Sequence, residues 1–255
     1  MKDRKGIFDE ILETFENDDI REFAKKVIDN APLYFFEVPA SSSHKYHPAY
    51  ACETPLGLAK HTVALIRILN HIWGVECINT QFTSRERDLL RVAGIAHDMM
   101  KSGTQEEYEK SKWTKFDHPL LAAKMVYGMD GLTKEERKFI AMAISSHMGQ
   151  WNTDKRNPEV VLPTPQDKYQ IILHLADYLA SRKDIEIKFN STEKEQTSAA
   201  PSEPAPDINT WKFPWGKYAG KTIPEVAAEN KGYIRWAKEN MDKEPAKSLL
   251  ASFNY

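Results

Sequence analysis

The chain has 255 residues, 41% of them hydrophobic, and a formal net charge of −2. A chain of this length can form one hydrophobic core with a small additional unit. The net charge alone favours no class of partner. Because no apolar run approaches about 18 residues and residues 1–17 are charged and amphipathic, we expect neither a transmembrane helix nor a signal peptide. The two cysteines form no disulfide framework and no CxxC motif, so we expect a protein of the reducing cytoplasm.

Apolar residues recur at helical spacing through most of the chain. Residues 7–30 predict one or two amphipathic helices, whereas prolines and a serine run break the periodicity of residues 31–50. Five further helices are expected, one through residues 61–72 and four that begin at Ser84, His118, Thr133 and residues 164–167. Almost no segment alternates with the period of a strand, so the sequence predicts an all-α core.

Six histidine and aspartate residues are distributed over these predicted helices. They are His61, the adjacent pair His97 and Asp98, His118, His147 and Asp177. Imidazole and carboxylate groups suit divalent ions such as Mn²⁺, Fe²⁺, Co²⁺, Ni²⁺ and Mg²⁺. Six such groups exceed the needs of one closed site, which predicts two ions close together. An adjacent His-Asp pair can give an imidazole to one ion and a carboxylate that bridges both.

Residues from about 56 to 185 resemble an HD-domain metal-dependent phosphohydrolase. The matching stretches are PLGLAKHTVALIRIL, LLRVAGIAHDMMKSG, FDHPLLAAKMV, FIAMAISSHMGQW and IILHLADYLASR. The resemblance implies an all-α HD-domain core, in which the metal ligands shared across the superfamily are His61, His97, Asp98 and Asp177. It also implies that His118 and His147 are the extra pair of the two-metal members. Many relatives read H-D-[IL]-G-K, whereas this chain reads HDMMK, with Met100 where the small residue usually stands.

By this resemblance, two divalent ions hold a bridging hydroxide that attacks a phosphoester. Asp98 is then a catalytic residue as well as a ligand. Lys101 is either a catalytic and substrate-binding residue that offsets charge on a non-bridging phosphate oxygen, or a solvated lysine. Some HD-domain exoribonucleases are rich in histidine just before the first ligand, which makes His47 a candidate for binding substrate phosphate. His174 is either a hydrogen-bond partner of the site or an ordinary helix residue.

The last quarter of the chain differs in composition. Residues 190–208 are polar and rich in proline, which predicts a flexible, disordered linker. Residues 209–255 carry eight basic and five acidic side chains, an excess of +3 that leaves −5 for residues 1–208. Over about 35 residues this segment resembles the small C-terminal domain of exodeoxyribonuclease X-like proteins. The matching residues are Trp215-Gly216-Lys217-Tyr218, Gly220-Lys221-Thr222, Tyr233 and Trp236.

We expect this module to be a small mixed α/β fold. Its aromatic residues alternate with lysines, a combination that suits stacking on bases and attraction of phosphates. In so short a module, several of the same rings are also needed for a hydrophobic core. The aromatic residues of the module are Trp211, Phe213, Trp215, Tyr218, Tyr233 and Trp236.

The sequence therefore predicts a cytoplasmic phosphohydrolase with an HD core over residues 1–189 and two divalent ions. Its expected substrate is a nucleotide or single-stranded nucleic acid, and the tail favours a phosphodiesterase or nuclease. Three alternatives stay open. The first is a hydrolase of (deoxy)nucleoside phosphates or dinucleoside polyphosphates, and the second is a di-iron HD-domain oxygenase, which uses the same six ligands. The third is a nucleic-acid-binding adaptor with a relic metal site.

Overall fold

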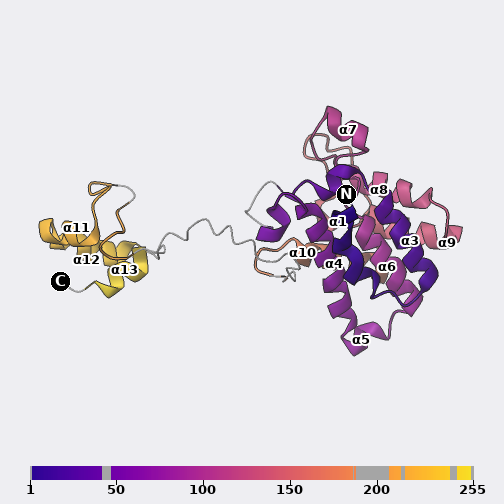
Figure 1. Ribbon diagram of the computed structural model, residues 1–255, viewed down its shortest axis with the longest axis horizontal. Coiled ribbons are helices and arrows are strands. Elements are labelled where there is room, and N and C mark those ends of the chain that lie inside the picture. The colour runs from indigo at the N-terminus through magenta and orange to yellow at the C-terminus, as the bar shows by residue number, and fades with distance from the viewer. Residues whose placement is uncertain are drawn as a thin grey trace. The chain divides into compact units, whose positions relative to one another are not determined.

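In this computed structural model the described residues are 2–41, 47–185, 187, 207–213, 216–241 and 246–253. The chain divides into two compact units, Met1–Lys188 and Phe189–Tyr255 (Figure 1), and each is considered by itself. The predicted linker, residues 190–208, lies outside the described residues except for Asp207 and Ile208. No helix among the described residues is long and apolar enough to cross a membrane.

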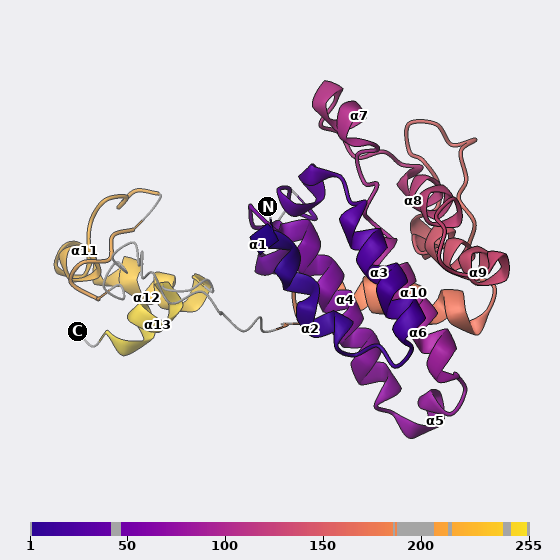
Figure 2. The same ribbon diagram turned by 45° about the vertical axis from the view of Figure 1, so that its right-hand side comes forward.

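The first unit is helical, as predicted. Its elements are α1 (Lys2–Lys5), η1 (Gly6–Phe8), α2 (Asp9–Leu12), α3 (Asp18–Asp29), η2 (Leu33–Phe36), η3 (Ala49–Cys52), α4 (Gly57–Trp73), α5 (Glu76–Asn79), α6 (Ser84–Ala96), α7 (Gln105–Lys110), α8 (His118–Tyr127), α9 (Lys134–Ser145), η4 (Gly149–Trp151) and α10 (Lys168–Ala180). Helix α4 packs against α6 and α10, α6 packs against α3 and α9, and α8 lies along α9 (Figure 2). The described part of this unit contains no strand, only an isolated bridge between Thr153 and Val161.

Local capping explains where two of the central helices begin. Helix α9 follows the predicted capping box, in which Thr133 accepts from the backbone of Glu136 and the Glu136 side chain accepts from the Thr133 backbone. The predicted N-cap of α6 was wrong by one residue, because the cap is Thr83 and not Ser84. Thr83 has an acid three residues later, Glu86, and so completes a capping box, whereas Ser84 has Arg87 at that position.

The second unit corrects the predicted mixed α/β module, because its described residues form no strand. It consists of the helices α11 (Ile223–Glu229), α12 (Lys231–Asn240) and α13 (Ala246–Ser252). Before them, Lys212 and Thr222 form a single isolated bridge. Gly216 and Gly220 between these residues have φ values of 86° and 83°, in the left-handed region. Glycine adopts this conformation without strain, and the chain reverses so that the backbone nitrogen of Phe213 donates to the carbonyl oxygen of Lys221 at 2.9 Å.

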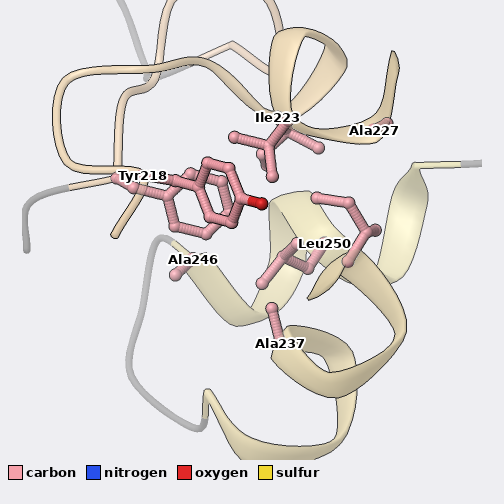
Figure 3. Close-up of a cluster of buried hydrophobic side chains, with 9 residues drawn as sticks. Tyr218, Ile223, Ala227, Ala237, Ala246 and Leu250 are labelled. Carbon is pink, nitrogen blue, oxygen red and sulfur yellow. The ribbon is translucent and has the colours of Figure 1, made fainter. Parts of the chain in front are cut away.

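The aromatic residues of this unit divide between core and surface. Phe213 and Tyr218 are 1% and 4% exposed and belong to the core that α11, α12 and α13 complete. Figure 3 shows Tyr218 pointing into this cluster, toward Ile223 and Leu250. Trp236 in contrast is 44% exposed, and Trp215 lies outside the described residues. The expected core role is therefore confirmed for Phe213 and Tyr218, and stacking on bases stays a prediction.

Candidate metal centre

Helices α4, α6, α8, α9 and α10 bring all six predicted ligands to one place. His61 lies within α4 and Asp177 within α10, two helices that pack against each other. The other four lie at helix ends: His97 is the C-cap of α6, Asp98 follows it, His118 is the first residue of α8, and His147 comes two residues after α9. The histidines and Asp98 are at most 4% exposed, whereas the Asp177 side chain is 20% exposed and thus opens the site to solvent.

One half of the site consists of His61, His97 and Asp177. The Nε2 atom of His61 lies 3.0 Å from Oδ1 of Asp177 and 3.3 Å from Nε2 of His97. The Nε2 atom of His97 lies 3.6 Å from the same aspartate oxygen. Three ligand atoms this close together could hold a metal ion.

The other half of the site is organised by Asp98, whose two oxygens have different neighbours. Its Oδ1 lies 2.9 Å from Nε2 of His118 and 3.8 Å from Nε2 of His147. Its Oδ2 lies 3.7 Å from Nε2 of His97, which belongs to the first half. Together His97, Asp98 and His147 form a second group that could hold a metal ion. Asp98 is thus placed between the two halves.

Three of the histidines are oriented by the same backbone hydrogen bond. The Nδ1 atoms of His97, His118 and His147 lie 2.7, 2.7 and 2.8 Å from the carbonyl oxygens three residues earlier in each case. A carbonyl oxygen only accepts, so each Nδ1 carries the proton and donates it. In the neutral ring this leaves a lone pair on Nε2, the atom that faces the centre of the site, which is the form a metal requires.

The environment keeps these groups in the protonation state that binds metal. Burial, together with the nearby His97, lowers the pKa of His147 to about 3. Burial likewise lowers the pKa of His97. Burial would raise the pKa of Asp98, but Lys101, His97 and His118 together outweigh burial and hold this pKa well below its usual range. At neutral pH His97 and His147 are therefore neutral imidazoles beside the ionised carboxylate of Asp98.

This donor set fits divalent cations. The Nε2 atom of His118 is buried and faces Oδ1 of Asp98 at 2.9 Å. Because Nδ1 of the neutral ring donates to the Lys115 carbonyl, both of these atoms are acceptors and neither donates to the other. Around it, imidazole lone pairs and carboxylate oxygens converge with Lys101 as a nearby counter-charge. One or two divalent ions with nitrogen and oxygen ligands would satisfy these acceptors.

The remaining predicted residues lie around this centre. The Nζ atom of Lys101 lies 2.6 Å from Oδ2 of Asp98, and the lysine side chain is 18% exposed. The ring of His47 lies 6.4 Å from that of His61, and its pKa is lowered to about 4, mainly by burial. His174 donates from Nδ1 to the backbone oxygen of His147 at 2.7 Å, so it supports the loop that carries a candidate ligand.

One supporting residue was not predicted. The hydroxyl group of Tyr34, which is fully buried, accepts from the backbone nitrogen of Ser102 at 3.0 Å and donates to the backbone oxygen of Gly103 at 2.7 Å. These bonds fix the turn that follows His97 and Asp98 and that carries Lys101. Tyr34 stands in a segment without periodicity, so its only sequence signal is an aromatic run, LYFF, between prolines.

Comparison with known families agrees with this arrangement. Residues 58–182 match the HD domain, and all six residues of the cluster lie within that match. Residues 213–242 match the exodeoxyribonuclease X-like C-terminal domain. No curated protein and no solved structure matches the chain. Residues 58–182 are thus an HD domain of the metal-dependent phosphohydrolase superfamily, and an exodeoxyribonuclease X-like C-terminal domain follows it in the same chain.

Proposed function

We propose that this protein uses two divalent ions to hydrolyse phosphodiester bonds of a nucleic acid. The observation that carries this proposal is the position of Asp98, whose Oδ1 faces His118 and His147 while Oδ2 faces His97. His61, His97 and Asp177 would hold one ion, His118 and His147 the other, and Asp98 both. Such a pair of ions activates water and neutralises the charge that develops on phosphate during in-line displacement.

The chain itself would contribute two groups that act on the substrate. Lys101 lies against Asp98 and is partly exposed, so its ammonium group would neutralise a non-bridging phosphate oxygen. His47 stands next to His61 as a neutral imidazole at physiological pH, since its pKa is lowered to about 4. A neutral imidazole has one N–H group, which would donate a hydrogen bond to a phosphate oxygen.

The choice of a polynucleotide over a free nucleotide rests on the second unit. Its match is to the C-terminal domain of an exodeoxyribonuclease, and residues 209–255 carry the basic excess of the chain. Trp236 is 44% exposed, and its ring lies 5.3 Å from that of Tyr233. Because Phe213 and Tyr218 are in the core, Trp236 is the exposed ring among the described residues of this unit that would stack on bases.

A substrate panel tests this function. The purified full chain is loaded with Mn²⁺, Ni²⁺ or Mg²⁺ and kept free of oxygen. We expect it to cleave bis(p-nitrophenyl) phosphate and single-stranded oligonucleotides, because hydrolysis needs no redox chemistry. Asp98→Asn should abolish cleavage, whereas Asp18→Asn, at an aspartate of α3 whose side chain is 85% exposed, should not change it.

Two outcomes would contradict this assignment and identify the alternatives. Activity that requires iron and consumes oxygen would indicate a di-iron oxygenase. Rapid hydrolysis of nucleoside phosphates or dinucleoside polyphosphates, with intact oligonucleotides, would indicate a small-nucleotide hydrolase.

A further inference from the structure

An exposed aromatic pair lies beside the metal centre. Trp151, the last residue of η4, stacks on Tyr178 of α10 with ring centroids 5.6 Å apart and an interplanar angle of 11°. The guanidinium group of Arg182 lies 4.6 Å from the centre of the Tyr178 ring. Trp151 nevertheless remains 45% exposed. A large indole surface is therefore open to solvent, stacked on a tyrosine that has a cation over its ring.

The backbone ties this pair to the candidate ligands on both sides. Tyr178 directly follows Asp177. On the other side, the ring of Trp151 lies 6.1 Å from that of His174, which donates a hydrogen bond to the backbone of His147. The turn between His147 and Trp151 packs closely on His174, because a Cβ added at Gly149 would come within 2.2 Å of that ring. The aromatic pair thus has a fixed position relative to the metal centre.

Arg182 brings a positive charge that no acid of the described chain neutralises. Its Nε atom is buried without a hydrogen-bond partner among the described residues, and its terminal nitrogen donates to the Ser181 hydroxyl at 3.0 Å. Arg182 lies over the ring of Tyr178, the residue that directly follows Asp177, and is therefore close to the metal centre. Because no acid of the described chain pairs with this guanidinium group, its terminal nitrogens are groups that a bound anion would satisfy.

We propose that Trp151, Tyr178 and Arg182 form a subsite that holds one nucleoside unit of the substrate. The base would stack on the exposed face of Trp151, and Arg182 would bind a phosphate oxygen of the same unit. Indole and guanidinium groups recognise bases of any sequence through their flat faces and their charge. This inference rests on the proposed function, because it assumes a substrate that carries bases, and it adds the residues that would recognise one of them.

Two simple probes, adenosine 5′-monophosphate and ribose 5-phosphate, separate the base from the phosphate. Each is titrated calorimetrically into the full chain loaded with Mn²⁺. We expect Trp151→Ala to weaken binding of the adenosine probe about fivefold to a hundredfold, the range for one stacked base, and to leave ribose 5-phosphate unchanged. Trp151→Phe should retain most of the affinity, and Trp151→Leu, which keeps the apolar bulk without an aromatic face, should not. Arg182→Gln should weaken both probes.

Tyr127→Ala is the matched control for these variants. Tyr127 is 39% exposed and also has an arginine over its ring, with the guanidinium of Arg137 at 5.9 Å. It stands at the end of α8 opposite His118, about 14 Å along the helix at 1.5 Å per residue. Its removal should change neither titration.

The outcomes distinguish this subsite from the proposed function. Equal affinity of the wild type for both probes, or equal weakening of both by Trp151→Ala with bound Mn²⁺ unchanged, would overturn the subsite. If Trp151→Ala also loses bound Mn²⁺, the comparison is made with Trp151→Leu, because leucine keeps the packing on Tyr178. Unchanged affinity of Trp151→Leu for adenosine 5′-monophosphate would then overturn the subsite. A base preference that depends on Trp151 would support the subsite even if the substrate panel showed no phosphodiester cleavage, and only the proposed function would then fail.

Discussion

Asp98 is the residue on which the proposed two-metal site depends. Its two oxygens contact different halves of the cluster, so its loss should remove both ions, whereas loss of His118 should remove one. We expect elemental analysis after anaerobic loading to give about two metals per chain for the wild type, near zero for Asp98→Asn and about one for His118→Ala. A wild-type value of one that His118→Ala leaves unchanged would instead indicate a four-ligand site of His61, His97, Asp98 and Asp177.

His147 makes the stability of the metal-free protein dependent on pH. Burial lowers its pKa from 6.5 to about 3, so the unfolded chain takes up a proton below pH 6.5 that the folded chain refuses. Lowering the pH from 6.5 to about 3 therefore favours unfolding. We expect the free energy of unfolding to fall by about 1.4 kcal/mol per pH unit from this group alone. Urea unfolding with a chelator at pH 7, 6 and 5 measures the slope, which should be shallower in His147→Gln. Identical slopes would show that His147 is protonated in the folded state.

The helices of the first unit were predictable because their signals are local. Capping boxes and apolar faces lie within a few residues of each other, so the start of α9 at Thr133 and the start of α8 at His118 followed from the sequence. The one-residue error at α6 has the same origin, since Thr83 and Ser84 both cap well in isolation. Only the acid at Glu86, three residues after Thr83, distinguishes them.

The orientation of the candidate ligands was not predictable in the same way. His97 and His147 lie at or beyond helix ends, where helical periodicity no longer indicates direction. Their rings are set by hydrogen bonds to Gly94 and Ile144. Trp151 and Tyr178 are 27 residues apart in sequence and meet only in the fold. The identity of the six ligands came from a resemblance in order and spacing, whereas their geometry depends on tertiary packing.

Tyr34 links element η2 to the turn after α6, and its hydroxyl group can be removed without changing the shape of the ring. Tyr34→Phe leaves the buried backbone groups of Ser102 and Gly103 without this partner. We expect a loss of about 1–3 kcal/mol in the free energy of unfolding and a further loss of activity, because the turn carries Lys101. Chemical denaturation and the metal-loaded phosphodiester assay measure the two effects. Tyr50→Phe is a control, since the buried Tyr50 hydroxyl donates to the backbone of Ala180 and not to this turn. Similar loss of activity in both variants would contradict a specific role for Tyr34.

At the scale of the whole molecule, the chain combines the HD domain with a second unit that is basic and has a hydrophobic core of its own. The core of the second unit includes Phe213, Tyr218, Val226, Ile234 and Leu250, so it does not need the first unit to bury its apolar residues. The sequence located this unit by composition and resemblance but not its helical fold. The segment before these helices contributes a single isolated bridge between Lys212 and Thr222, and the regular structure of the described residues after it is helical.

Removal of the second unit tests whether it recruits a polynucleotide. A chain that ends at Lys188 keeps every candidate ligand, so we expect hydrolysis of bis(p-nitrophenyl) phosphate to stay almost unchanged. Cleavage of a single-stranded oligonucleotide should fall through a higher KM, about tenfold if one stacked base and a few lysine contacts are lost. Affinity of the intact chain for the oligonucleotide should also fall steeply with rising salt, because phosphate contacts release counterions.

Trp236→Ala in the full chain separates binding from folding in this test. Because Trp236 is 44% exposed and not part of the buried core, its loss should weaken oligonucleotide binding and leave the circular dichroism spectrum unchanged. Tyr218→Ala, at a residue 4% exposed, should instead unfold the second unit and reproduce the truncation. Equal oligonucleotide cleavage by the intact chain, the truncated chain and Trp236→Ala would mean that the second unit does not bind the substrate. The basic excess of residues 209–255 would then serve another partner, and the HD domain would be better assigned to small nucleotides.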